Sequence, residues 1–549
     1  MHDPKTETDG RRDAGPLRRL LGATGVFAIA ILVSRVLGMG RESLIANRFG
    51  AGAEIDCYRA AESIPFGMGT ATQTITAGAL IPILSRYLRQ GDEQSVAKVG
   101  GTVLSFVLVL GGVLTALGEV FARPAAGLLA PGFARPQAAL TADLLRLLGP
   151  CFLFAGVGGV LSCLVLARQR FVAPAVAHVA PNVVIICCLL GFTAAMGIKS
   201  LALGLTLGTG AYMLVLLVAA KGWAKGRRML SWQPGHEGVS RVLALALPLV
   251  APAIGIPLLT GLERRLLSGQ DPGSIASLSY GTTLVATPIG LLISSLGTVL
   301  LPILSWDAAQ AERTQLARRT SIAIRLVLMV MTLVCALLLG LGRLSVISLY
   351  GSGRFDAVAV SGATSVVSWL APLTLGVGLT EVLTKAYHAI QDTTTPVVIW
   401  CAVTAVRVGA SVLAAGPMGA RGLALVRGAS SVVQAVLLGA GIKRVVGRHI
   451  WSDTTRLALT SALAGALITA ALLLAQGLFP LATDAGRPAC ALRLLLLSGG
   501  ATLVYTVAVL AANPRERAAI LVRATGRPTP SDGPDRPDGG GHSSHGNPQ

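Results

Sequence analysis

The most informative residues of this sequence are charged side chains that lie inside apolar stretches. The segment LVSRVLGMGRES, residues 32–43, belongs to an apolar run that begins near Ala23, yet it contains Arg35, Arg41 and Glu42. One charged side chain at the centre of a membrane helix costs about 2.5–3.5 kcal/mol on insertion scales. Contact with water, with an opposite charge or with a ligand can offset that free-energy cost. These three residues are therefore candidates for a functional site.

Seven further charged residues follow the same pattern in three other stretches. In two of the stretches the spacing is i, i+3 or i, i+4, which allows ion pairs along one face of a helix. The residues are Asp56, Arg59 and Glu62 in DCYRAAES, Glu263 and Arg264 in GLERRLL, and Glu381 and Lys385 in a later apolar span.

Arginines that face a water-filled cavity suit a diphosphate, because the planar guanidinium can bond two oxygens at once. Neighbouring carboxylates would hold the guanidinium groups in position. The alternative is a set of ion pairs that only brace the bundle, and local pairing is the simpler interpretation of Glu381 and Lys385. We predict a cationic cavity that binds an anion. The predicted substrate contacts are Arg35, Arg41, Asp56, Arg59, Glu62 and Arg264, with supporting charges at Glu42, Glu263, Glu381 and Lys385.

The composition predicts an all-α polytopic membrane protein. Of 549 residues, 53% are hydrophobic and 13% are charged, whereas soluble domains carry about 25% charged residues. Apolar stretches of 18 or more residues, each long enough to span a bilayer, recur between Ala23 and Ala512. We expect about 14 transmembrane helices.

A short internal sequence repeat indicates how these helices are organised. LIPILSR at 80–86 returns as LLPILSW at 300–306, 220 residues later. Each copy would end the second span of a six-span unit, which predicts two lobes in parallel pseudo-repeat followed by a C-terminal helix pair. The predicted segments are a cytoplasmic N-terminal segment 1–19, an N-lobe 20–220, a C-lobe 221–442, a helix pair 443–512 and a disordered cytoplasmic tail 513–549.

The net charge of +20 follows from membrane topology rather than from nucleic-acid binding. Both termini and the alternate connections that we assign to the cytoplasm hold 29 of the 46 lysine and arginine residues. This is the bias expected of cytoplasmic loops, so both termini are predicted to be cytoplasmic.

Several chemistries have no signature in this sequence. It contains no Walker A phosphate loop, and no HExxH, CxxC or GxSxG motif. We therefore expect a transporter without catalytic residues, metal site or cofactor, rather than an enzyme. Energy would come from an ion gradient, the membrane potential, or substrate supply and removal.

Three stretches resemble the MurJ/MviN-type lipid II flippases of the multidrug/oligosaccharidyl-lipid/polysaccharide exporter superfamily. They are SRVLGMGRESLIANRFGAGAEIDCYRAAESIP at 34–65, LYGSGRFDA at 349–357 and KAYHAIQDTTTPVVI at 385–399. The resemblance implies 14 helices in two lobes around a central cationic cavity. It also implies alternating access to the two faces of a bacterial cytoplasmic membrane.

The same resemblance implies a substrate and a set of cavity residues. The substrate would be undecaprenyl-diphosphate carrying the peptidoglycan disaccharide-pentapeptide. Arg35 and Arg41 match cavity arginines of the family, while Glu42 and Asp56 match its acidic positions. The implied partners are this lipid-linked oligosaccharide, membrane lipids and other cell-envelope synthesis proteins.

Some positions depart from the family pattern and leave the head group open. Gly69 and Thr70 stand where the family carries a basic pair, Thr282 and Thr283 replace charged positions, and Glu381 replaces a lysine. Lipid II is the default substrate. The alternatives are another lipid-linked polysaccharide intermediate, or transport of drugs by a cation-coupled antiporter of the same superfamily.

Overall fold

The computed structural model describes residues 14–221, 229–309, 313–446, 454–479, 486–514 and 517. Residues 1–13 of the predicted N-terminal segment, most of the run KGWAKGRR and the predicted disordered tail beyond Arg517 lie outside this description.

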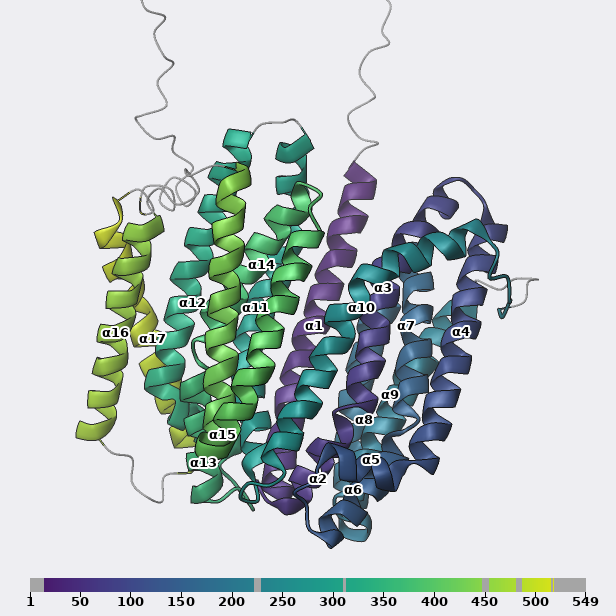
Figure 1. The fold of residues 1–549 in the computed structure, drawn as a ribbon. Helices are drawn as coiled ribbons and strands as arrows, with labels where there is room; N and C mark the ends of the chain where they lie inside the picture. The colour runs from purple at the N-terminus through teal and green to yellow at the C-terminus, as the bar shows by residue number, and fades with distance from the viewer. Residues whose placement is uncertain are drawn as a thin grey trace, which may run out of the picture.

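The described chain is a bundle of α-helices without a β-strand (Figure 1), so the predicted fold class is confirmed. The helices are α1 (Ala14–Phe49), α2 (Ala53–Glu62), α3 (Pro65–Arg89), α4 (Glu93–Val120), α5 (Ala122–Leu129), α6 (Arg135–Leu148), α7 (Cys151–Ala167), α8 (Val172–Met196), α9 (Lys199–Ala220), α10 (Glu237–Leu267), α11 (Ser274–Ala309), α12 (Arg313–Tyr350), α13 (Ala357–Leu370), α14 (Leu373–Ala389), α15 (Thr394–Val446), α16 (Thr454–Leu478) and α17 (Arg487–Ala512).

The number of membrane spans agrees roughly with the expected 14. Within the described residues, nine helices are long and apolar enough to cross a membrane, or ten if the bent pair α13–α14 forms one span. The long run α15 is itself two helices, because its backbone is non-helical at Gly419, where φ is 55°. The repeat motifs fall on α3 and α11, the helices on which the predicted duplication rests; the duplication itself stays a prediction.

Local sequence explains where two of the helices begin. The Oδ1 atom of Asp92 accepts a hydrogen bond from the Ser95 amide at 2.9 Å and so caps α4. Hydrogen bonds from the Ser95 side chain and amide hold the pKa of Asp92 below its ordinary value. Asp356 caps α13 in the same way, through a 2.8 Å bond from the Ala359 amide.

Helices α1–α9 form the first half of the molecule, and helices α11–α15 form the second half. The two halves share an apolar core at one end of the bundle. One buried cluster mixes Ile45 and Tyr58 of the first half with Tyr280, Tyr350 and Val366 of the second. Two other clusters stay within one side: one joins α3, α4, α7 and α9 with the start of α10, and the other joins α11, α12, α14 and α15. The halves are therefore packed together at one end, and each has a core of its own at the other.

Close contacts between residues 47–50 and 352–354 hold the two halves together at this end, which we call the sealed end. The Arg354 amide donates to the Asn47 carbonyl at 2.9 Å, and Asn47 Nδ2 donates to Ser352 Oγ at 2.9 Å. Gly50 and Gly353 both have left-handed backbones, with φ of 64° and 61°. A Cβ atom on Gly50 would collide with the Arg354 carbonyl, and one on Gly353 with the Asn47 carbonyl. Glycine at both positions allows the halves to approach this closely.

Helix α10 lies between the two halves and contacts both (Figure 1). A Cβ atom on Gly67 of α3 would come within 2.8 Å of Pro257 of α10. On the other side, one on Gly255 of α10 would collide with the Trp400 ring of α15. Small residues thus let one helix pack against α3 and α15 at once.

The C-terminal pair α16 and α17 packs against α12 and forms a core with it. The start of α17 also reaches the sealed end. Arg487 Nη2 donates to Ser43 Oγ of α1 and to the Leu349 carbonyl of α12, both at 2.6 Å, while Nη1 donates to Ser352 Oγ at 3.0 Å. One guanidinium therefore links the helix pair to both halves.

The sealed end makes a specific prediction for Gly353→Ala. Gly91 has a similar left-handed backbone, with φ of 72°, but a Cβ atom there would meet nothing within 4 Å. Gly91→Ala should therefore cost only the conformational penalty of about 1–2 kcal/mol. Gly353→Ala should cost more, because it adds the collision with the other half. Thermal unfolding of the purified variants measures the difference, and equal melting temperatures would show that the contact is dispensable.

Candidate functional site

Ion pairs connect α1 and α2 next to the sealed end. The turn FGAG at 49–52 joins α1 to α2, and charged side chains of the two helices meet beyond it. Arg59 Nη2 lies 2.5 Å from Glu42 Oε2, and Arg59 Nη1 lies 3.0 Å from Glu62 Oε1. Arg41 Nη2 lies 2.8 Å from Glu42 Oε1. The side chains of Glu42 and Arg59 are only 4% and 8% exposed, so their charges rely on one another.

A further arginine approaches this group from α10. Arg264 Nη2 lies 3.9 Å from Glu62 Oε1, which is a loose contact. The Nε and Nη1 atoms of Arg264 are buried and have no hydrogen-bond partner among the described residues. A buried donor without a partner is costly, so Arg264 has hydrogen-bonding capacity left for a ligand.

The preceding residue on α10 anchors two more arginines. Glu263 Oε1 accepts from Arg407 Nη2 at 2.5 Å and from Arg427 Nε at 3.1 Å, and Glu263 Oε2 accepts from Arg427 Nη2 at 2.7 Å. Arg427 Nη1 also donates to Thr282 Oγ1 at 2.9 Å. Glu263 thereby ties α10 to both helical parts of α15, and Arg427 ties α15 to α11.

Because Glu263 and Arg264 are neighbours, these contacts form one group, which we call the arginine cluster. Its five arginines outnumber its three glutamates, which leaves two positive charges. The members are Arg41, Arg59, Arg264, Arg407, Arg427, Glu42, Glu62 and Glu263.

Arg35 lies apart from the arginine cluster on the same helix. It is six residues before Arg41, or about 9 Å along the helix axis. Its side chain is exposed, and its guanidinium lies against Gly290 of α11, where a Cβ atom would come within 2.8 Å of Nη2. Arg35 forms no ion pair with any described residue, so its charge is free to meet an anion.

The structure gives the other predicted site residues different surroundings. Asp56 does not pair with Arg59: its Oδ2 accepts from the Gly273 amide at 2.6 Å and its Oδ1 from the Ala276 amide at 2.7 Å. Asp56 thus links α2 to the start of α11, and both its oxygens are occupied.

The predicted pair on α14 forms locally. Lys385 Nζ lies 3.4 Å from Glu381 Oε1, as the i, i+4 spacing allows. Neither residue takes part in the ion pairs of the arginine cluster.

Three residues of this region were missed by the sequence analysis. Arg407 and Arg427 lie in apolar spans, so the signal that identifies Arg35 could have found them. Asn182 of α8 carries no such signal, yet its Oδ1 accepts from Arg41 Nη1 at 3.1 Å. An uncharged residue 141 positions away cannot be paired with Arg41 from sequence spacing.

The sequence model for "Lipid II flippase MurJ" matches residues 45–484. This chain belongs to the MurJ family. Among curated MurJ relatives, the probable lipid II flippase of Thermotoga maritima is 26% identical over 448 residues, covering 81% of this chain and 89% of the relative. The probable lipid II flippase of Vibrio cholerae is 28% identical over 476 residues, covering 83% and 89%.

Solved structures give the same fold. A lipid II flippase MurJ in an inward closed conformation superposes with a TM-score of 0.73 at 19% identity, covering 91% of this chain and 99% of that one. An inward-facing multidrug resistance MATE transporter superposes with a TM-score of 0.60 at 14% identity, covering 80% and 95%. At these identities the likeness establishes the fold, and membership of the MurJ family rests on the sequence.

The arginine cluster predicts a large stability difference between two glutamate variants. Glu263→Gln would leave the partly buried Arg407 and Arg427 without their shared, buried carboxylate, which should cost about 3–5 kcal/mol. Glu381→Gln removes a partly exposed helical pair and should cost less than about 1 kcal/mol. Chemical denaturation of both purified variants measures this difference, and a Glu263→Gln protein as stable as Glu381→Gln would contradict the assignment.

Proposed function

We propose that this protein is a flippase that moves lipid II from the cytoplasmic to the outer leaflet for peptidoglycan synthesis. Membership of the MurJ family and curated lipid II flippases as relatives support this function. On this proposal the protein is a membrane transporter and not an enzyme. Its substrate is a polyprenyl-diphosphate-linked saccharide, and its other contacts are membrane lipids and other cell-envelope synthesis proteins.

The observation that carries the proposal is the excess of guanidinium donors where the two halves meet. Two buried nitrogen atoms of Arg264, and the Nε atoms of Arg41 and Arg59, have no hydrogen-bond partner in the part of the chain that the structure describes. A diphosphate presents several acceptor oxygens and at least two negative charges, which matches the net charge of the arginine cluster. The glutamates keep the guanidinium groups ordered before substrate binds, so less entropy is lost on binding.

Arg35 would be the first cation that the diphosphate meets. It lies about 9 Å from Arg41 toward the end where each half has its own core. Nearby side chains of α1 are exposed, including Leu32 at 52% and Val36 at 61%. A head group entering from that end would pass Arg35 and then reach the arginine cluster.

Alternating access is the mechanism that suits this geometry. The sealed end must open, and the opposite end must close, for a head group to leave on the other side. The bonds between Asn47 and 352–354 and between Asp56 and α11 are few and local, so they can break without unfolding a helix. The apolar contacts of the shared core would have to separate with them.

The flippase proposal predicts selective loss of transport in charge variants. Arg35→Gln and Arg264→Gln should each lower lipid II flipping at least tenfold, because a hydrogen bond to a charged group contributes about 1.5–3 kcal/mol. The matched control is Arg241→Gln, an arginine of α10 that pairs with Glu237 on the surface. The measurement is the amount of labelled lipid II that becomes accessible on the far face of proteoliposomes.

The outcomes separate this proposal from its alternatives. Wild-type flipping in both charge variants would reject the anion site. If cells depleted of this protein lose another surface glycan but keep normal peptidoglycan, the substrate is a different lipid-linked polysaccharide intermediate. Drug sensitivity without an envelope defect would point to an antiporter.

The membrane orientation is a further part of the proposal. The basic bias of the alternate loops supports a multi-pass protein of the bacterial cytoplasmic membrane with both termini in the cytoplasm. We expect a cysteine added to either terminus to resist an impermeant thiol reagent in intact cells. A cysteine placed in the 131–134 connection should react. Labelling of a cysteine at a terminus would show that the topology is the reverse of the proposed one.

A further inference from the structure

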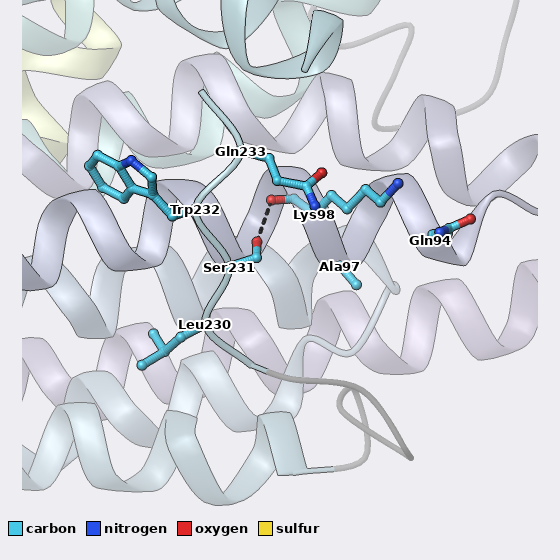
Figure 2. A pocket seen from close by; sticks show the side chains of 7 residues that line it. All are labelled: Gln94, Ala97, Lys98, Leu230, Ser231, Trp232 and Gln233. Atoms are coloured by element: carbon cyan, nitrogen blue, oxygen red, sulfur yellow. Dashed lines mark hydrogen bonds between the residues drawn. The ribbon is translucent and has the colours of Figure 1, made fainter. Parts of the chain in front are cut away.

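A pocket of about 580 Å³ lies on the first half of the molecule, and none of its lining residues belongs to the arginine cluster. It forms where the connection between α9 and α10 crosses the first turns of α4 (Figure 2). Its volume is within the range of about 300–1,000 Å³ typical of ligand pockets. The lining residues are Gln94, Ala97 and Lys98 of α4 with Leu230, Ser231, Trp232 and Gln233 of the connection.

Specific contacts hold this connection against α4. Ser231 Oγ donates to the Lys98 carbonyl at 2.9 Å, and the Gln233 amide donates to Thr102 Oγ1 at 3.1 Å. A Cβ atom on Gly101 would come within 2.7 Å of Ser231 Oγ, so the approach depends on glycine at that position. The wall of the pocket is therefore fixed by the fold.

The pocket contains one uncompensated positive charge. Lys98 forms no ion pair with any described residue, and its side chain extends along α4 toward Gln94 (Figure 2). The nearby acidic groups are occupied: Glu93 pairs with Arg168 at 2.5 Å, and Asp92 caps α4. The pocket thus offers an ammonium group to an incoming anion.

Apolar surface continues from the pocket along α4. Trp232 and Leu230 at its rim are 61% and 48% exposed. Val109 follows Lys98 by eleven residues, about three helical turns, so it lies on nearly the same face of α4. Val109 and Phe106 are 55% and 52% exposed. Tryptophan and lysine above an apolar helix face are typical of the membrane interface.

We propose that this pocket binds the head group of an anionic phospholipid. The phosphodiester would lie on Lys98, head-group hydroxyls would bond the amides of Gln94 and Gln233, and the acyl chains would cover Phe106 and Val109. Basic pockets at a membrane face are suited to such lipids. A soluble phosphate ester has no chains for that apolar surface, and a choline head group would bring a second positive charge beside Lys98. This site does not depend on which substrate the protein moves.

Native mass spectrometry of the delipidated full-length protein, titrated with dioleoyl phosphatidylglycerol, tests the proposal. Lys98→Gln should weaken retention of the tightest lipid about fivefold, the effect of one lysine near an anionic surface. Lys98→Arg should retain it. The matched control is Lys443→Gln, which removes an exposed lysine near the end of α15 in the other half and should change nothing. Quenching of Trp232 fluorescence by brominated phosphatidylglycerol, read against Trp232→Phe, reports whether the lipid is at this pocket.

Three results would overturn the proposal. One is unchanged lipid retention and Trp232 quenching in Lys98→Gln. Another is equal retention of dioleoyl phosphatidylcholine, which would show that the negative charge is not recognised. The third is displacement of the lipid by millimolar glycerol phosphate, which would identify a site for soluble phosphate esters. Because lipid II transport is not measured, none of these results bears on the flippase proposal.

Discussion

The placement of five guanidinium groups among apolar helices is the constraint on which the rest of this structure depends. Each guanidinium presents five N–H donors and cannot lose its charge, so burial requires acceptors at fixed positions. Glu42 and Glu263 supply them, each held between two arginines. The turn at 49–52 and the position of α10 between the halves bring these partners together from α1, α2, α10 and both parts of α15.

The charges of the arginine cluster are not fully neutralised, and on the flippase proposal this excess is what binds the substrate. A buried network in which every donor had a partner would only stabilise the fold. Donors on Arg264, Arg41 and Arg59 that have no partner among the described residues leave capacity for an anion. The network crosses the boundary between the halves through the neighbouring residues Glu263 and Arg264. An anion bound there touches both halves, so its arrival can favour one of their relative positions over the other.

Much of the fold follows from the sequence, because long apolar stretches leave few alternatives to helices in a membrane. Charge inside those stretches identified most of the arginine cluster, and the same signal at Arg407 and Arg427 was available. The link from Asp56 to the Gly273 and Ala276 amides could not be foreseen, since it joins backbone groups more than 200 residues away. The pocket at Lys98 could not be predicted from the sequence either, because it forms only where the connection between α9 and α10 packs against Gly101.

Arg487 gives the C-terminal helix pair an unexpected importance. Its guanidinium donates hydrogen bonds to Ser43 Oγ of α1 and to the Leu349 carbonyl of α12, so it holds the two halves together at the sealed end. A chain that ended before α17 would lose this fastening and would leave Ser43 and Leu349 without one of their partners. Helices at the edge of the bundle therefore reinforce the contact between the two halves, and a shift at the start of α17 would weaken that contact.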